Sequence, residues 1–290
     1  MVRRTFDGGA QRGAQRQLQP RSSRSPRSSW ISQTRSLRVP EVTVYFWIVK
    51  GLSTAMGEST SDYLVHAINP YVAVILSFVV FVTALFLQFR MGRYVAWTYW
   101  FAVVMVGVFG TMAADVLHVV LGVPYVASSI LFALILGAVF FTWGRTESTL
   151  SIHTINTPRR EAFYWATVCA TFAMGTALGD LTAYTLQLGY FGSLLLFALL
   201  FILPIAGRRM LHWNEVFTFW LAYVLTRPLG ASFADGFGKP VSYGGLGWGS
   251  GWVALGLTVS IAIIVLWLAL TRADVQGETD QGDEGSLNQG

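Results

Sequence analysis

The sequence contains little charge. Only 12% of its 290 residues are Asp, Glu, Lys or Arg, whereas 53% are hydrophobic, and the mean hydropathy is +0.52. A soluble domain carries about 25% charged residues. The apolar segments are long enough to cross a bilayer. The composition therefore excludes an ordinary soluble protein and predicts one membrane domain with polar tails.

Cysteine and histidine are also scarce. Cys169 is the only cysteine, which excludes an intramolecular disulfide and a cysteine-rich metal site. His153 and His212 fall in expected junctions between helices. The sequence also lacks a phosphate-binding glycine loop and the HExxH and GxSxG motifs. We therefore expect no enzyme and no permanently bound cofactor, and a divalent metal ion enters only as a candidate substrate.

The two ends of the chain differ in charge. Residues 1–38 contain nine arginines and one acid, and residues 273–290 contain five acids and no base. Both segments are too polar to fold alone, so we predict a disordered Arg/Ser-rich arm and a disordered acidic tail. The surplus positive charge belongs to the arm and is no evidence for nucleic-acid binding. Contact with lipid headgroups, a transit peptide and a non-functional extension stay open as interpretations of the arm.

Eight apolar segments, separated by polar or Gly/Pro junctions, predict an all-α protein with eight transmembrane helices. Asn69-Pro70, Thr157-Pro158 and Pro40-Glu41 are typical of helix starts. The expected helices span about 41–66, 71–89, 94–119, 124–144, 160–187, 190–209, 213–236 and 248–271.

Arginines recur at every second junction between these helices. Since positively charged loops stay in the cytoplasm, both termini are expected there, in a bacterial inner membrane. The clusters are Arg90 and Arg93, then Arg145, Arg159 and Arg160, then Arg208 and Arg209, then Arg272, and the other junctions hold only Lys239.

The odd-numbered helices share one spaced pattern. Each has a Trp preceded by an aromatic residue, a Gly ten residues after the Trp, and an Asp five residues later. The sets are Trp47, Gly57, Asp62; Trp100, Gly110, Asp115; Trp165, Gly175, Asp180; and Trp220, Gly230, Asp235. Four matches in register indicate internal duplication. We expect four parallel two-helix repeats (about 41–89, 94–144, 160–209 and 213–271), with the patterned helices facing the centre.

The chain resembles a bacterial membrane family defined by a repeat of unknown function, whose members are labelled uncharacterised membrane-anchored proteins. The stretches VPEVTVYFWIVK, SIHTINTPRREAFYW and TRPLGAS carry the resemblance, which covers about residues 39–271. The family implies a repeat architecture and no activity.

The repeated Asp residues are the main candidates for function. Asp lies fifteen residues beyond Trp, about 22 Å along a helix, so it falls inside the bilayer. A carboxylate at the bilayer centre costs about 2.5–3.5 kcal/mol, which function or a counter-charge must offset. We expect Asp62, Asp115, Asp180 and Asp235 to ring a polar cavity, with Glu58 as a fifth acid.

Such a ring suits hard divalent cations such as Mn²⁺, Mg²⁺ or Ca²⁺. His66 and His118 share helix faces with Asp62 and Asp115 and would favour Mn²⁺ as tentative ligands. Proton-linked exchange fits the same carboxylates. Arg227, inside the seventh helix, could offset the acids or bind an anionic substrate.

Structural roles are the alternative to these binding roles. The Asp side chains could bond to neighbouring helices as packing contacts. Gly57, Gly110, Gly175 and Gly230 are best explained by close helix packing, and the Trp residues by interfacial anchoring or packing.

The sequence thus predicts a transporter that contacts the bilayer and a small ion or solute, either a divalent metal exporter or a proton-coupled exchanger. The alternatives are a non-transporting scaffold or sensor whose acids are structural and, less favoured, an intramembrane enzyme. Oligomeric state is left open.

Overall fold

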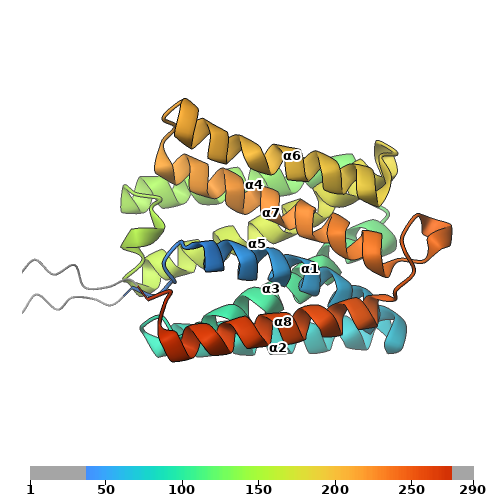
Figure 1. The fold of residues 1–290 in the computed structure, drawn as a ribbon, viewed down its shortest axis with the longest axis horizontal. Coiled ribbons are helices and arrows are strands. Elements are labelled where there is room, and N and C mark those ends of the chain that lie inside the picture. The colour runs from blue at the N-terminus through green and yellow to red at the C-terminus, as the bar shows by residue number, and fades with distance from the viewer. Residues whose placement is uncertain (1–36, 276–290) are drawn as a thin grey trace, which may run out of the picture. The chain divides into compact units, whose positions relative to one another are not determined.

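The computed structural model describes residues 37–275, so the predictions for residues 1–36 and 276–290 lie outside the described residues. Within 37–275 every regular element is a helix, and all eight expected helices are present (Figure 1). They are α1 (Val44–Ala67), α2 (Pro70–Met91), α3 (Ala96–Asp115), α4 (Tyr125–Glu147), α5 (Pro158–Asp180), α6 (Gly189–Met210), α7 (Glu215–Gly238) and α8 (Ser250–Thr271).

Two of the three expected helix starts are correct. The side chains of Asn69 and Thr157 accept hydrogen bonds from the first-turn amides of α2 and α5, and each is followed by proline. Pro40-Glu41 does not begin α1. Thr43 is the cap instead, because its hydroxyl accepts from the Phe46 amide, while the Glu41 amide donates to the carbonyl of Asp274.

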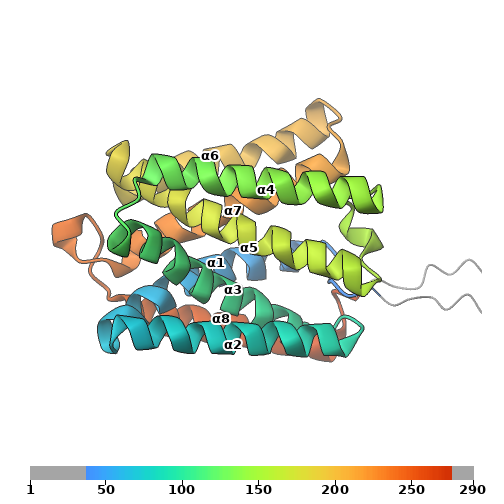
Figure 2. The ribbon, with the colours of Figure 1, turned by 180° about the vertical axis from the view of Figure 1, so that it is seen from behind.

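The patterned helices α1, α3, α5 and α7 form a closed ring, in which each contacts the next and α7 contacts α1. The return helix of each repeat packs most extensively on the following repeat: α2 on α3, α4 on α5, α6 on α7 and α8 on α1. In both views the ring helices lie between the α2/α8 pair and the α4/α6 pair (Figures 1 and 2). The expected inner position of the patterned helices is therefore confirmed.

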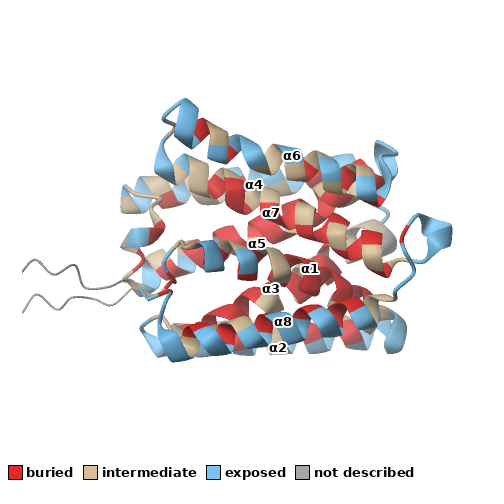
Figure 3. Ribbon diagram, viewed as in Figure 1, coloured by how far each residue is buried: buried red, intermediate tan, exposed pale blue. Residues whose placement is uncertain are grey.

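Burial separates the two kinds of helix (Figure 3). The return helices expose large apolar side chains such as Ile75, Leu134, Leu199 and Ile263. Among the described residues, six helices are long and apolar enough to cross a membrane: α2, α3, α4, α5, α6 and α8. The equally long α1 and α7 do not meet that measure.

The junctions that hold the arginine clusters meet at one end of the helices. The Tyr94 amide donates to Leu37, the Arg38 amide to Ile155 and the Glu41 amide to Asp274. The side chain of Arg38 also pairs with buried Glu161 at 2.5 Å. We call this the termini end, and the opposite end, which holds Lys239, the Lys239 end.

The start of the predicted acidic tail is packed. Asp274 is 1% exposed, and the Tyr94 hydroxyl donates to its carboxylate. Burial raises the pKa of Asp274, with the hydrogen bond from Tyr94 acting in the opposite direction.

Three of the four repeated glycines lie at close helix contacts. A Cβ on Gly57 would lie 2.8 Å from the backbone of Gly107 on α3, and one on Gly230 would lie 2.9 Å from the Ala55 amide nitrogen on α1. A Cβ on Gly175 would overlap the side chain of Arg227 on α7. At Gly110 the nearest atom is 3.4 Å away, so close packing does not account for that glycine.

Gly57→Ala should destabilise the protein by about 1–3 kcal/mol, the usual cost of overpacking, because backbone cannot move aside as a flexible side chain can. Gly137→Ala is the matched control, since Gly137 is mid-helix in α4 with nothing within 4 Å of the added Cβ. Thermal unfolding in detergent measures both variants. Equal melting temperatures for the two would refute the close α1–α3 contact.

Candidate functional site

The ring helices present residues to the axis at intervals of four. Because every fourth residue lies on roughly one helix face, equivalent positions of the four repeats form layers. From the termini end the layers are Phe46, Tyr99, Tyr164, Phe219; then Lys50, Val103, Val168, Tyr223; then Thr54, Gly107, Phe172, Arg227; then Glu58, Thr111, Thr176, Ala231; then Asp62, Asp115, Asp180, Asp235. We number these axial layers one to five.

Arg227 connects layers three and four through hydrogen bonds. Its side chain is fully buried, and its Nη2 lies 2.7 Å from Glu58 Oε2. Nη2 also donates to the hydroxyls of Thr111 and Thr176, the latter at 2.8 Å, and Nη1 donates to the carbonyl of Thr54 at 3.3 Å. The Thr111 hydroxyl donates in turn to Glu58 at 3.2 Å. One guanidinium on the fourth repeat thus binds groups from the other three.

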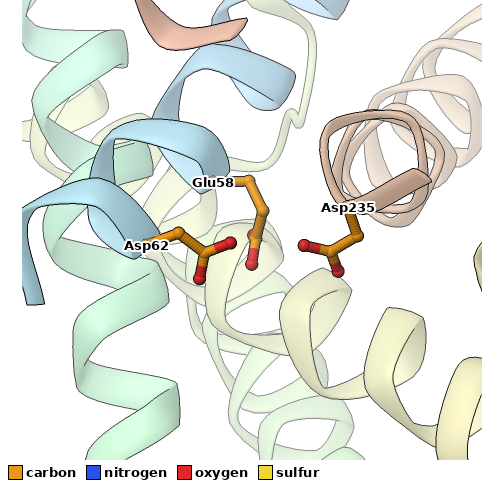
Figure 4. Close-up of side chains that lie close together, drawn as sticks. All are labelled: Glu58, Asp62 and Asp235. Atoms are coloured by element: carbon orange, nitrogen blue, oxygen red, sulfur yellow. The ribbon is translucent and has the colours of Figure 1, made fainter. Parts of the chain in front are cut away.

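Glu58, Asp62 and Asp235 form a carboxylate cluster. One oxygen of each lies within 4.8 Å of the others, and the three side chains point toward one another from α1 and α7 (Figure 4). All three residues are at least nine-tenths buried, with exposures of 5%, 8% and 6%. Asp235 Oδ1 accepts no hydrogen bond from the described part of the chain. Carboxylates at this spacing can share a cation or a proton.

Lys239 supplies the counter-charge at this end. Its Nζ lies 2.6 Å from Asp62 Oδ2 and 3.8 Å from Asp235 Oδ1. Burial alone would lower the pKa of Lys239, but the Asp235 and Asp62 carboxylates raise it above its usual value. The raised pKa keeps the ammonium charged at neutral pH. The ion pair is therefore lost only when the pH exceeds the pKa of an ordinary lysine.

The expected ring of four Asp is only half assembled. Asp115 and Asp180 are half-buried and lie outside the three-carboxylate cluster. Each ends its α-helix and is followed by a π-helical turn, Val116–Val120 and Leu181–Thr185. Such turns are rare and concentrate at functional sites. The first and fourth repeats thus hold the cluster, while the second and third change helix type at the same position.

Neither histidine joins the cluster. His66 Nδ1 lies 2.7 Å from the backbone carbonyl of Asp62, and His118 Nδ1 lies 3.0 Å from that of Val123. The other nitrogen of His118 faces the Ser128 hydroxyl at 3.4 Å. The described residues therefore offer an all-carboxylate ligand set, because these histidines bond within their own turn or to the next helix.

A cavity of about 940 Å³ opens beside the cluster at the Lys239 end. Asp62 and Lys239 line it together with aromatic side chains, namely Tyr63, Tyr184, Tyr190, Tyr243 and Trp252. At the other end of the axis, layer one is closed by aromatic rings, with the Tyr99 and Tyr164 hydroxyls bonded to each other. The carboxylate cluster thus borders the cavity and is separated from the termini end by packed side chains.

Several site residues escaped sequence reasoning. Lys239 entered only as an exception to the arginine pattern, and the Arg227 partners Thr111 and Thr176 were not predicted. Lys50, which is fully buried in layer two, was not predicted either. The four-residue spacing from each repeated Asp back to the aromatic before Trp was the signal that could have found them.

The fold and its apolar surface define a helical repeat protein of the multi-pass membrane class. The chain matches the family model described as Repeat of Unknown Function (DUF347) four times, at residues 45–94, 98–149, 163–209 and 218–274. It belongs to that family, as the sequence resemblance indicated. Searches of curated proteins and of solved structures found no match.

Removing one partner of the Arg227–Glu58 pair should destabilise the fold by about 3–5 kcal/mol, because the other charge is left buried. Arg227→Met and Glu58→Met are the single variants, and the double variant should recover much of the loss. Thermal unfolding of the wild type, the two single variants and the double variant completes this double-mutant cycle.

Arg208→Met serves as the control. Its pair with Glu215 is exposed, so the change should be below about 1 kcal/mol. Additive losses in the buried pair would show that Arg227 and Glu58 do not depend on each other.

Proposed function

We propose that this protein is a secondary transporter with eight transmembrane helices and both termini in the cytoplasm, in a bacterial inner membrane. The arginine clusters at the termini end support this orientation, since positive loops stay inside. The polar helices α1 and α7 cross as part of the ring, where neighbouring helices cover their charges. The Lys239 end and its cavity then face outward.

The cargo in this proposal is a cation held by Glu58, Asp62 and Asp235. The observation that carries the proposal is a buried carboxylate cluster beside a large cavity, with a lysine ammonium already bound at 2.6 Å. Oxygen-only ligands favour hard divalent cations such as Mn²⁺ or Mg²⁺. Lys239 would act as a tethered substitute for the cargo and move aside when the cation arrives.

Charge balance supports a divalent cargo coupled to protons. Three carboxylates face one fixed guanidinium, so a divalent cation in place of the Lys239 ammonium would leave the cluster neutral. When the cation leaves, Lys239 or protons can take its place. Neutrality matters because an unbalanced charge inside a membrane is costly.

The structural alternative rests on a specific observation as well. Arg227 and Lys239 already pair with acids of the cluster, so these acids could serve only to hold α1 against α7. In that case replacing them would reduce the amount of folded protein rather than transport.

Total cellular metal content, measured by mass spectrometry across added divalent metals, tests the proposal. Cells carry the wild type, an Asp62→Asn/Asp235→Asn double variant, a Glu41→Gln control or an empty vector. Glu41 is an exposed acid at the termini end. We expect the wild type and the control to change one metal severalfold, and the double variant to match the empty vector.

The protein reaching the membrane is quantified in the same cells. A double variant that is made normally but moves no metal supports transport. Loss of the variant from the membrane supports the structural role, and a wild type that changes no metal contradicts a divalent cargo.

A further inference from the structure

A groove opens on the surface at the termini end, away from the carboxylate cluster. It has a volume of about 930 Å³ and lies between α1, α6 and α7, whose ribbons lie next to one another in Figure 1. Most of its wall is apolar, with Ile48 on α1, Phe201 and Ile205 on α6, and Phe219 and Leu229 on α7. Its charged side chains lie where α6 ends and α7 begins. The groove therefore has a polar mouth and an apolar interior.

The length of the groove matches one leaflet of a bilayer. On α7 its lining begins at Glu215 and reaches Leu229, fourteen residues further along the helix. At 1.5 Å per residue this span is about 21 Å. Half of a bilayer, with its headgroup region, is about 20–22 Å thick. The polar mouth therefore lies at the level of the lipid headgroups, and the apolar interior lies at the level of the acyl chains.

The interior of the groove is open because α1 presents a small residue there. Gly51 lines the groove, and a Cβ added to it would meet no atom within 4 Å. Trp47, one turn earlier, is half-buried, whereas the equivalent Trp of the other three repeats is buried. The Trp47 ring packs against Phe201 and Phe219, with ring centroids 5.9 Å and 5.7 Å apart. The first repeat thus uses its Trp as part of the groove wall.

The mouth of the groove carries charges of both signs. Arg208 and Arg209 lie in the last turn of α6, and Glu215 lies in the first turn of α7. Glu215 pairs with Arg208 at 3.4 Å and with His153 at 3.7 Å, whereas Arg209 has no ion pair within residues 37–275. Glu41 borders the mouth as a second acid, so neither sign dominates. Such a mouth is complementary to a headgroup that carries both charges.

We propose that this groove binds one phospholipid with a zwitterionic amine headgroup, from the leaflet at the termini end. The phosphate contacts Arg209, the ammonium faces Glu215, and an acyl chain lies along the groove beside Trp47 and Gly51. Arginine matches the oxygens of a phosphate with two parallel N–H donors. Basic groups between transmembrane helices are recurrent sites for lipid headgroups.

The bound lipid would contact the two helices that hold the carboxylate cluster. The groove is walled by α1 and α7, and the same helices carry Glu58, Asp62 and Asp235 nearer the Lys239 end. A ligand that binds only the folded state stabilises it. The lipid should therefore raise the melting temperature. This inference needs the membrane and not the cargo, so it is independent of the proposed transport.

Native mass spectrometry of the purified full-length protein in detergent tests the proposal. The probe is dioleoyl phosphatidylethanolamine, compared with dioleoyl phosphatidylglycerol, which has the same chains and a net negative charge. We expect one phosphatidylethanolamine per chain, bound about tenfold more tightly than phosphatidylglycerol, the factor corresponding to one charged hydrogen bond. Gly51→Leu fills the groove and Arg209→Met removes the phosphate contact, so each should weaken this binding about tenfold or more. Phosphatidylethanolamine should raise the melting temperature of the wild type and not that of Gly51→Leu.

Two variants serve as matched controls and should bind the lipid as the wild type does. Gly137→Leu also adds a side chain to a helical glycine with nothing within 4 Å of the new Cβ, and Arg90→Met removes an exposed arginine in the last turn of α2. Size-exclusion profiles verify folding, and Arg209→Met carries the test if Gly51→Leu is not folded.

Three results would overturn the lipid site. They are phosphatidylglycerol binding as tightly as phosphatidylethanolamine, wild-type binding in Arg209→Met or in folded Gly51→Leu, and a dimer of this chain that binds no lipid. None of them bears on the cargo, because metal content in cells tests the proposed transport separately.

Discussion

The buried ion pair between Arg227 and Glu58 is the interaction on which the arrangement of the ring depends. Two charges inside a membrane domain are costly unless each is paired and hydrogen-bonded. That condition is met because Thr54, Thr111 and Thr176 surround the guanidinium. One side chain therefore fixes the distances between all four repeats at the same depth.

This packing places demands on neighbouring positions. The α5 backbone must approach Arg227 so closely that only glycine fits at position 175, and α1 must approach α7 so closely that only glycine fits at position 230. The Trp–Gly–Asp spacing that the repeats share thus sets where the ring helices contact one another. The charged residues differ between the repeats and make the bundle asymmetric.

The candidate site is asymmetric, although it is built from equivalent positions of four repeats. The position after each repeated glycine holds Glu58, Thr111, Thr176 and Ala231, so one acid faces two hydroxyls and a methyl group. The repeated acids also diverge: Asp62 and Asp235 share Lys239, whereas Asp115 and Asp180 lie at transitions to π-helix. Duplication supplied four equivalent positions, and different side chains at those positions leave the acids with Arg227 on one side and Lys239 on the other.

The sequence predicted the fold better than the site, for physical reasons. The positions of the helices follow from the length of the apolar segments. Which helices lie inside and which outside follows from where polar residues repeat, so both could be predicted. The pairing of each return helix with the next repeat depends on side-chain packing and left no periodic signal. Comparison of repeats emphasises shared residues such as Asp115 and Asp180, whereas Lys50 and Lys239 each occur in one repeat only.

One local prediction failed, and the packing narrowed another. The Pro40-Glu41 start was wrong because Thr43 caps the helix instead, with its hydroxyl accepting a hydrogen bond from the Phe46 amide. The Trp residues take the packing role, one of the two expected for them, since Trp100, Trp165 and Trp220 are 1%, 2% and 5% exposed. Sequence alone shows that an aromatic residue is present, but its depth is decided by the neighbouring helices.

Water access to layer four shows whether the ring encloses a path for cations. The single native cysteine makes this simple: with Cys169→Ala as background, Ala231→Cys is treated with a membrane-impermeant thiol reagent on intact cells. Val241→Cys and Met210→Cys, 74% and 76% exposed at opposite ends, report the two sides. If the ring encloses such a path, residue 231 should be labelled from the side that labels residue 241, and a bound divalent cation should slow that labelling. Labelling at 231 from neither side would contradict it.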